Sequence, residues 1–248
     1  MNPESVKTVA DILRSANRIC VLTGAGVSAE SGIPTFRASD GLWENHAIED
    51  VASPQGWQRN PQLVWDFYHA RRAKAGSVLP NPGHAVLAQL EQRFGDRFTL
   101  VTQNVDGLHQ RAGNRNVIEL HGSLYQTRCT ECGLVRDRGL EALDPMPHCA
   151  CGGVERPNIV WFGEMLPPAN WSRATKAANS CDVFLIVGTS AVVYPAASLI
   201  QTAKMQKRPA RIIEFNLTET DATPYVDAGL YGPSGESLPA LIHELQWD

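Results

Sequence analysis

The sequence has little of what marks a nucleic-acid-binding or membrane protein. Its 22 basic side chains are outnumbered by 26 acidic ones, and no long block of one sign offers phosphates an electrostatic grip. No apolar run is long enough to cross a bilayer, and the first, Ile19 to Leu22, is too short for a secretion signal. Repeats and low-complexity segments are also lacking. We therefore expect a cytoplasmic protein without nucleic-acid or membrane partners.

The apolar pattern alternates short strand-like runs with helix-period stretches, which predicts an α/β fold with a mostly parallel sheet covered by helices. Helices are expected around 6–13, 61–75, 84–94, 170–179, 196–206 and 238–245. Strands are expected at Ile19–Leu22, Phe98–Thr102, Val117–Leu120, Val183–Val187 and Arg211–Phe215. Ligands of such sheets bind where strands end, so the polar residues there are the candidates for a site.

Two regions interrupt this alternation and are predicted to form a smaller lobe. Residues of about 39–84 are too many for an ordinary loop, and about 126–157 hold most of the cysteines. We expect one domain, 1–248, whose large lobe comprises about 1–38, 85–125 and 158–248. The two inserts are then a helical segment and a metal-binding segment.

Four of the six cysteines form two close pairs, Cys129-x-x-Cys132 and Cys149-x-Cys151. Four thiolates fill a tetrahedral zinc site and leave no open position, so a zinc ion here would be structural. A redox CxxC motif would leave the second pair unexplained. A disulfide framework is not indicated either, because the remaining cysteines, Cys20 and Cys181, sit singly in apolar segments.

Two alternatives for the cysteine cluster stay open. His148 adjoins the shortened second pair and could replace one thiolate as a ligand. A nucleic-acid-binding zinc ribbon would need a basic face, but the local arginines are balanced by acidic residues: Arg128, Arg136 and Arg138 against Glu131, Asp137, Glu141 and Asp144.

Polar strings follow three of the predicted strands. Thr23 to Ser28 contains two glycines that would let the backbone approach a pyrophosphate, although tight turns use glycine for conformation alone and the spacing is not the usual dinucleotide fingerprint. Thr102 to His109 places amides and a carboxylate at a strand end, where capping of a helix is the simpler explanation. Glu119 to Ser123 contains His121, and a lone histidine there is often structural.

Taken together, these strings resemble the sirtuin (Sir2) family, and residues 24–37 match its NAD loop almost letter for letter. The resemblance covers nearly the whole chain. It implies a Rossmann-like parallel sheet with helices on both faces and a small zinc-binding and helical lobe. It also implies NAD-dependent removal of acyl groups from lysine side chains of proteins, with NAD consumed as a co-substrate and one structural zinc ion.

The resemblance assigns roles residue by residue. His121 corresponds to the catalytic base and Asn104 to a catalytic amide near the ribose, and imidazole suits a base because it titrates near neutrality. Phe36 would shield the nicotinamide–ribose bond, and Asp106 would hold the carboxamide. The full cofactor-binding set is Gly24, Ala25, Gly26, Ser28, Thr35, Phe36, Arg37, Trp43, Gln103, Asn104, Val105, Asp106, Gly188, Thr189, Ser190, Asn216, Leu217, Thr218 and Ser234.

A pocket for the acyl group is implied by the class III subgroup of this family, which prefers acidic acyl groups. Tyr68 and Arg71 share one helix face, like that subgroup's Tyr-x-x-Arg pair, and Ala52 matches a small pocket residue. An exposed helix with arginines is the simpler alternative. An arginine holding a distal carboxylate contributes roughly 1.5–3 kcal/mol, so succinyl-lysine is an expected substrate beside acetyl-lysine.

The substrate backbone is expected at Val160, Trp161, Phe162, Gly163 and Glu164, which resemble the family segment that pairs with an extended peptide. The alternative is a core strand ending before Pro167-Pro168. Two other functions remain open: mono-ADP-ribosyl transfer to protein, and a non-catalytic NAD-sensing module. A dehydrogenase is disfavoured because nothing resembling its proton relay accompanies the glycine loop.

Overall fold

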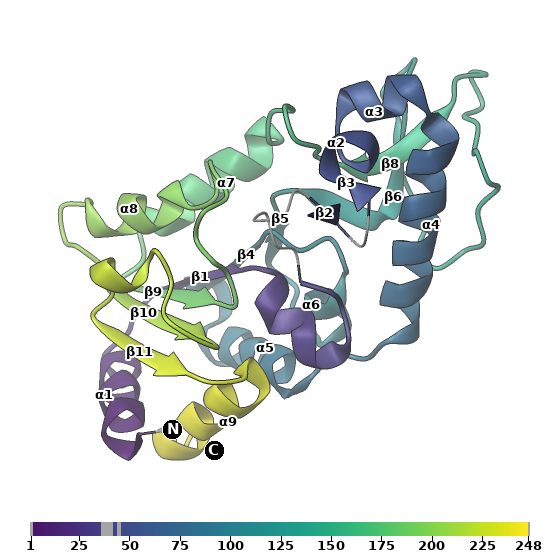
Figure 1. Cartoon of the computed structure of the whole chain (residues 1–248). Coiled ribbons are helices and arrows are strands. Elements are labelled where there is room, and N and C mark those ends of the chain that lie inside the picture. The colour runs from purple at the N-terminus through teal and green to yellow at the C-terminus, as the bar shows by residue number, and fades with distance from the viewer. Residues whose placement is uncertain (1, 36–41, 44–45, 248) are drawn as a thin grey trace.

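The central sheet has six parallel strands in the order β11-β10-β9-β1-β4-β5 (Figure 1). The structure is a computed structural model, and it describes residues 2–35, 42–43 and 46–247. The strands are β1 (Ile19–Thr23), β4 (Phe98–Thr102), β5 (Val117–Glu119), β9 (Val183–Val187), β10 (Arg211–Asn216) and β11 (Ala228–Tyr231). The predicted parallel sheet is confirmed, and β11 is an addition to it.

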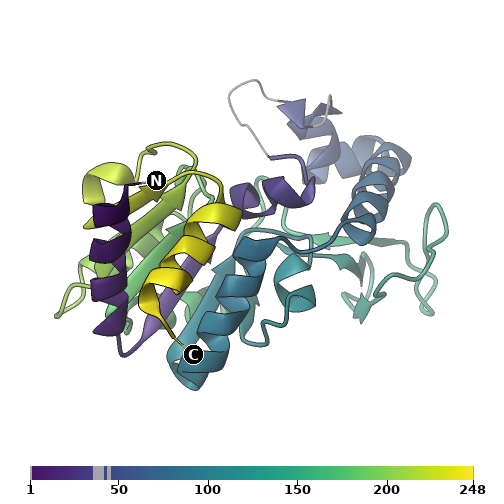
Figure 2. The same ribbon diagram turned by 90° about the horizontal axis from the view of Figure 1, so that it is seen from below.

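Helices cover both faces of this sheet, as predicted. Val21, Leu100 and Leu185 are neighbours in the sheet and pack toward α1 (Pro3–Arg14), α5 (Pro82–Phe94) and α9 (Ser234–Leu245), which lie side by side (Figure 2). Leu22, Val101 and Ile186 point the other way, toward α7 (Pro168–Ala178) and α8 (Ser198–Lys204). Because strand side chains alternate between faces, one apolar run supplies both cores.

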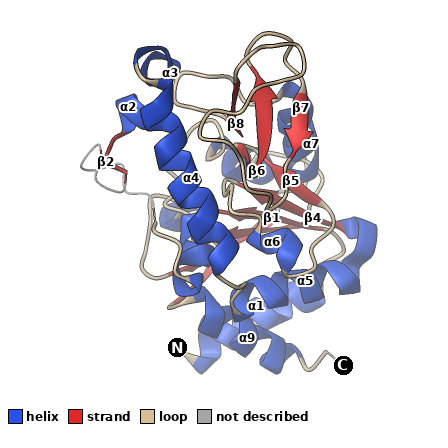
Figure 3. Cartoon of the chain, turned by 90° about the vertical axis from the view of Figure 1, so that its right-hand side faces the viewer, coloured by secondary structure: helices blue, strands red, loops and turns tan. Residues whose placement is uncertain are grey.

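A second, three-stranded antiparallel sheet stands beside the first and was not predicted. Its strands are β7 (Val135–Asp137), β6 (Gly122–Cys129) and β8 (Glu155–Ile159), in that order. It begins at Gly122, inside a range that the sequence assigned to the large lobe. The helix α4 (Pro61–Ser77) runs alongside it, near α2 (Ile48–Val51) and α3 (Pro54–Arg59) (Figure 3). The short strands β2 (Leu42–Trp43) and β3 (His46–Ala47) precede these helices.

Proline and asparagine fix where α4 and α5 begin. Both helices have proline in the first turn, where its missing N–H costs nothing. The Asn60 side chain accepts a hydrogen bond from Leu63 N–H in α4. Asn81 caps α5 in a capping box completed by the His84 side chain.

A third core joins the two sheets. Val64, Phe67 and Tyr68 of α4 pack with Leu124 of β6 and Ile159 of β8. Val105 and Leu108, which follow β4, belong to the same cluster. This packing holds α4 and the small sheet against the carboxyl end of the large sheet. Among the described residues, no helix combines the length and apolar character that a bilayer crossing needs.

Candidate active site and zinc site

A cavity of about 600 Å³ lies at the carboxyl ends of β1, β4, β9 and β10 and extends to α4 and the loop after β8. Its volume is within the usual range for ligand pockets, about 300–1,000 Å³. Most residues predicted for the site line it: Gly24, Ala25, Gly26, Thr35, Ala52, Tyr68, Arg71, Gln103, Asn104, Val105, Asp106, His121, Val160, Trp161, Phe162, Gly163, Glu164, Gly188, Thr189, Ser190, Asn216, Leu217 and Thr218. Segments that are far apart in the sequence thus meet at one place.

The other predicted residues are outside the described part of the chain or do not line the cavity. Phe36 and Arg37 are outside the described residues, as is the side chain of Trp43. Ser28 is buried beneath the cavity rather than lining it. Ser234 begins α9, does not line the cavity and donates its hydroxyl hydrogen bond to Glu30 at 3.2 Å, and its cofactor contact stays a prediction.

The glycines of the first loop are required by close approach to the loop after β9. A Cβ added at Gly26 would lie 2.7 Å from the carbonyl oxygen of Gly188, and one at Gly24 would lie 2.7 Å from Cβ of Thr189. Gly188 itself has a φ of 59°, and a Cβ there would lie 2.3 Å from the Val27 nitrogen. These glycines therefore allow the two loops to approach each other, and they leave a part of the cavity wall that is made of main chain. The 3₁₀ helix η1 (Ala25–Ser31) begins in this first loop.

Asn104 and Asp106 are held by buried hydrogen bonds that fix their orientation. The Asn104 amide donates to the Gly24 carbonyl at 3.0 Å and to the Ser28 hydroxyl at 3.2 Å. One Asp106 oxygen accepts from the Ser28 hydroxyl at 2.7 Å, the other from Leu108 N–H at 2.9 Å. Burial raises the pKa of Asp106 from its ordinary value, while these two hydrogen bonds oppose the rise. The site therefore presents a preoriented amide and carboxyl group.

Two histidines that the sequence did not single out lie beneath this group. His84 Nε2 is 3.3 Å from the Ser28 hydroxyl, and His109 Nε2 is 2.9 Å from that of Thr23. Their ring centroids are 4.9 Å apart. Burial lowers the pKa of His84 to about 4 and that of His109 well below its ordinary value, so both rings are neutral at pH 7. In the sequence, the position of His84 in the cap of a helix was the signal that could have drawn attention to this residue.

His121 lies just after β5 and lines the cavity. Its Nδ1 lies 3.0 Å from the carbonyl oxygen of Gln103, a geometry in which Nδ1 carries the proton and Nε2 is left as a base. Burial lowers the pKa of His121, and the hydrogen bond to Gln103 partly offsets this. The imidazole is therefore neutral at pH 7 and able to accept a proton.

Another part of the cavity wall is built from the residues that follow β4, β9 and β10. The Gln103 amide donates to the Thr189 hydroxyl at 2.9 Å, and the Asn216 amide donates to the Thr189 carbonyl at 2.9 Å. These hydrogen bonds connect β4, β9 and β10 at the carboxyl ends of the three strands. Polar groups suited to hydroxyls of a sugar are thereby gathered in this part of the wall.

Tyr68 and Arg71 lie on the wall formed by α4. The Tyr68 hydroxyl accepts a hydrogen bond from the Trp161 indole at 3.0 Å, and burial raises its pKa to about 12, so the phenol keeps its proton to donate. The Arg71 side chain is 8% exposed and its guanidinium lies 5.5 Å from the Phe67 ring centroid. The exposed-helix alternative is therefore excluded for this face, because both residues are buried against the cavity.

The segment 160–164 is an irregular loop, so the alternative of a core strand is wrong: β8 ends at Ile159. Arg156 holds the loop, donating to both oxygens of Glu164 at 2.8 and 2.7 Å and stacking 3.5 Å from the Trp161 ring centroid. Val160 N–H donates to His121 O, and Phe162 N–H donates to Ala52 O. The Arg156 contacts thus connect β8 to the Tyr68 wall.

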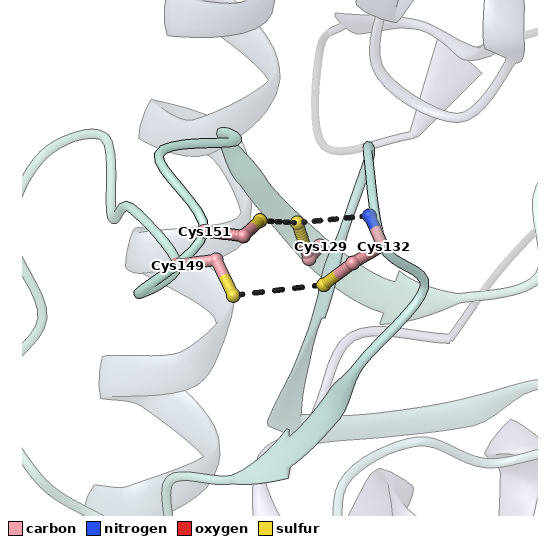
Figure 4. Close-up of side chains that lie close together, drawn as sticks. All are labelled: Cys129, Cys132, Cys149 and Cys151. Carbon is pink, nitrogen blue, oxygen red and sulfur yellow. Dashed lines mark hydrogen bonds between the residues drawn. The ribbon is translucent and has the colours of Figure 1, made fainter.

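The four clustered cysteines form a site whose sulfurs all lie within 4.8 Å of one another (Figure 4). Cys129 and Cys151 Sγ are 3.5 Å apart, and Cys132 and Cys149 Sγ are 3.8 Å apart. Tetrahedral zinc with Zn–S bonds of about 2.3 Å needs sulfurs about 3.8 Å apart, so the four fit that ion. His148 is exposed and outside this cluster.

Fold and site together define a nucleotide-binding α/β enzyme with an inserted zinc module. The Sir2 family model matches residues 24–195. An "NAD-dependent protein deacylase 2" from Pyrobaculum aerophilum is 47% identical, over 96% of this chain and 95% of that protein. The mitochondrial "NAD-dependent protein deacylase sirtuin-5" of Canis lupus familiaris is 43% identical, over 93% of this chain and 83% of that protein.

A solved structure described as a Sir2 homologue–NAD complex superposes with a TM-score of 0.87, at 45% sequence identity, covering 99% of this chain and 94% of the other. The chain belongs to the Sir2 family.

Proposed function

We propose that this protein is an NAD-dependent protein-lysine deacylase that removes succinyl and acetyl groups. The observation that carries this function is the convergence of His121, Asn104 and Asp106 with Tyr68 and Arg71 on one cavity. The reaction needs a base and polar groups that hold the nicotinamide ribose. A cation can in addition hold the carboxylate of a succinyl chain. Acylated-lysine proteins are the substrates.

The cavity residues fit NAD, because glycine main chain, amides and a carboxyl group surround it while the 600 Å³ volume leaves room for an extended ligand. When bound, NAD supplies a ribose carbon that becomes electrophilic as nicotinamide leaves, and it carries the acyl group away as O-acyl-ADP-ribose. His121 Nε2 takes a proton from a ribose hydroxyl and later returns one. Asn104 and Asp106 orient the nicotinamide end, and their own hydrogen bonds prevent them from turning.

The four thiolates of Cys129, Cys132, Cys149 and Cys151 would hold one structural zinc ion, with no chemical step assigned to it. Zinc would tie the start of the β6–β7 turn to the segment before β8. Thiolates of this kind need a reducing compartment, and on that ground we infer a cytoplasmic location.

The acyl preference rests on Tyr68 and Arg71. The Arg71 guanidinium can meet a carboxylate with two hydrogen bonds, and the Tyr68 phenol can add a third. Ala52 is 2% exposed and leaves room that a larger side chain would fill. An acetyl group makes no use of these donors, so it is accepted without being favoured.

Replacing Arg71→Met is expected to lower kcat/KM for a succinyl-lysine peptide by roughly ten-fold to a hundred-fold, the factor that loss of a charge-assisted hydrogen bond of about 1.5–3 kcal/mol implies. The rate on the matched acetyl-lysine peptide should change by less than about three-fold. Steady-state kinetics on the two peptides at saturating NAD measure both. Arg208→Met, at an exposed arginine outside the cavity, is the matched control. Equal losses on both peptides would contradict a carboxylate-binding role for Arg71.

A further inference from the structure

A buried carboxylate lies behind the cavity, beside the loop that follows β10. Glu214 is 0% exposed and does not line the cavity. Within the part of the chain that the structure describes, it forms no ion pair with a lysine, arginine or histidine. A carboxylate in such a place is costly to bury unless hydrogen bonds satisfy it. The hydrogen-bond partners of Glu214 therefore indicate its role.

Three hydroxyls donate to Glu214. Thr223 Oγ1 donates at 2.7 Å and Tyr231 Oη at 3.1 Å, and Thr220 Oγ1 donates to the other carboxylate oxygen. Tyr231 belongs to β11, whereas Thr220 lies in the loop after β10 and Thr223 begins the 3₁₀ helix η4 (Thr223–Tyr225) at the end of that loop. The carboxylate thus ties this loop to the edge of the large sheet.

The two threonine hydroxyls also accept hydrogen bonds from the loop's own main chain. Thr223 Oγ1 accepts from Thr220 N–H at 2.8 Å, and Thr220 Oγ1 accepts from Ala222 N–H at 3.1 Å. Each hydroxyl therefore passes a constraint from Glu214 to the backbone. The same loop supplies one wall of the cavity, formed by Leu217, Thr218, Glu219, Thr220 and Asp221.

We propose that Glu214 is a positioning residue for the nucleotide: by fixing the loop 217–223 it sets the affinity for the ADP-ribose portion of NAD. This inference rests on the proposed function, since it takes the cavity to be the NAD site. Glu214 acts through the loop and does not itself line the cavity. A mobile loop weakens the binding of NAD by the same amount in the ground state and in the transition state. This raises KM for NAD and leaves kcat unchanged.

The test uses Glu214→Gln in the full-length protein. The amide retains the shape but replaces one acceptor oxygen with a donor group, which cannot receive the threonine proton. We expect KM for NAD to rise about ten-fold, equivalent to about 1.4 kcal/mol. The Kd for ADP-ribose, measured by calorimetry without peptide, should rise by the same factor. The kcat and the KM for acyl peptide should stay within about two-fold, and Glu4→Gln, at an exposed site in the first turn of α1, should match the parent in every value.

A second pair of variants keeps the test decisive if Glu214→Gln does not fold. Thr223→Val removes a donor within the loop, whereas Tyr231→Phe removes one within β11. The loop variant should weaken ADP-ribose binding more than the strand variant does. Unchanged ADP-ribose affinity in folded Glu214→Gln or Thr223→Val, or a fall in kcat at constant KM, would overturn the inference. A parent protein that removes no acyl group in the presence of NAD would instead defeat the proposed function.

Discussion

Replacing His121→Ala is expected to lower kcat for deacylation by about 10²- to 10⁴-fold, the usual contribution of a positioned acid–base group. The loss follows from the geometry, because Nδ1 is engaged with the Gln103 carbonyl and Nε2 is the nitrogen left to face the cavity. Steady-state release of free lysine from an acyl peptide measures the effect. The KM for NAD should change much less, since the nucleotide is held by loops after other strands.

His243→Ala is the matched control for this variant. His243 is exposed in the last turn of α9 and lies outside the cavity, so its removal should leave kcat unchanged. The thermal midpoints of both variants show whether either change disturbs the fold. Deacylation by folded His121→Ala at the parental rate would contradict the assignment of the base.

Loss of the zinc ion is expected to unfold the small lobe and abolish activity. Structural zinc contributes about 10–16 kcal/mol of apparent binding free energy, more than the whole stability of most domains. The lobe carries β8, whose Arg156 holds Glu164 and Trp161, and Trp161 in turn donates to Tyr68. Cys149→Ala should therefore lose zinc, measured by atomic emission, together with its thermal stability and its turnover of both acyl peptides.

His148→Ala provides the matched control and settles the ligand set. Because the His148 side chain is outside the sulfur cluster, this variant should retain one zinc ion per chain and parental activity. Loss of zinc from His148→Ala together with its retention in Cys149→Ala would show that the imidazole is the ligand.

Strands with continuous apolar sequence could be predicted closely. Phe98–Thr102 and Val183–Val187 match β4 and β9 at both ends, since they are buried on both faces and bounded by polar residues. Ala228–Tyr231 could not be predicted in this way. It has four residues, one of them glycine, and becomes a strand through pairing with β10.

The antiparallel sheet escaped prediction for a different reason. Gly122–Cys129 contains polar and charged side chains, such as Gln126 and Arg128, whose pattern is not that of a buried strand. Its stability draws on cysteine thiolates and on ion pairs such as that of Arg138 with buried Glu155 at 2.7 Å, rather than on apolar alternation. The sequence showed the cysteines but not the sheet they support.

The candidate site could be anticipated where polar strings follow strands, since strand ends converge at one edge of a parallel sheet. Sequence could not show the layer beneath, where His84, His109 and Glu214 lie. These residues come from separate segments and act through hydrogen bonds to Ser28, Thr23 and the loop after β10. Such contacts depend on tertiary packing and leave no periodic signal along the chain.

The most direct test of the account is to identify the products formed from NAD and a succinyl-lysine peptide by mass spectrometry. We predict one nicotinamide, one free lysine peptide and one O-succinyl-ADP-ribose for each NAD consumed. A peptide that keeps its acyl group while ADP-ribose becomes attached to protein would contradict deacylation and indicate mono-ADP-ribosyl transfer. Free succinate released without any consumption of NAD would contradict the role of the nucleotide altogether.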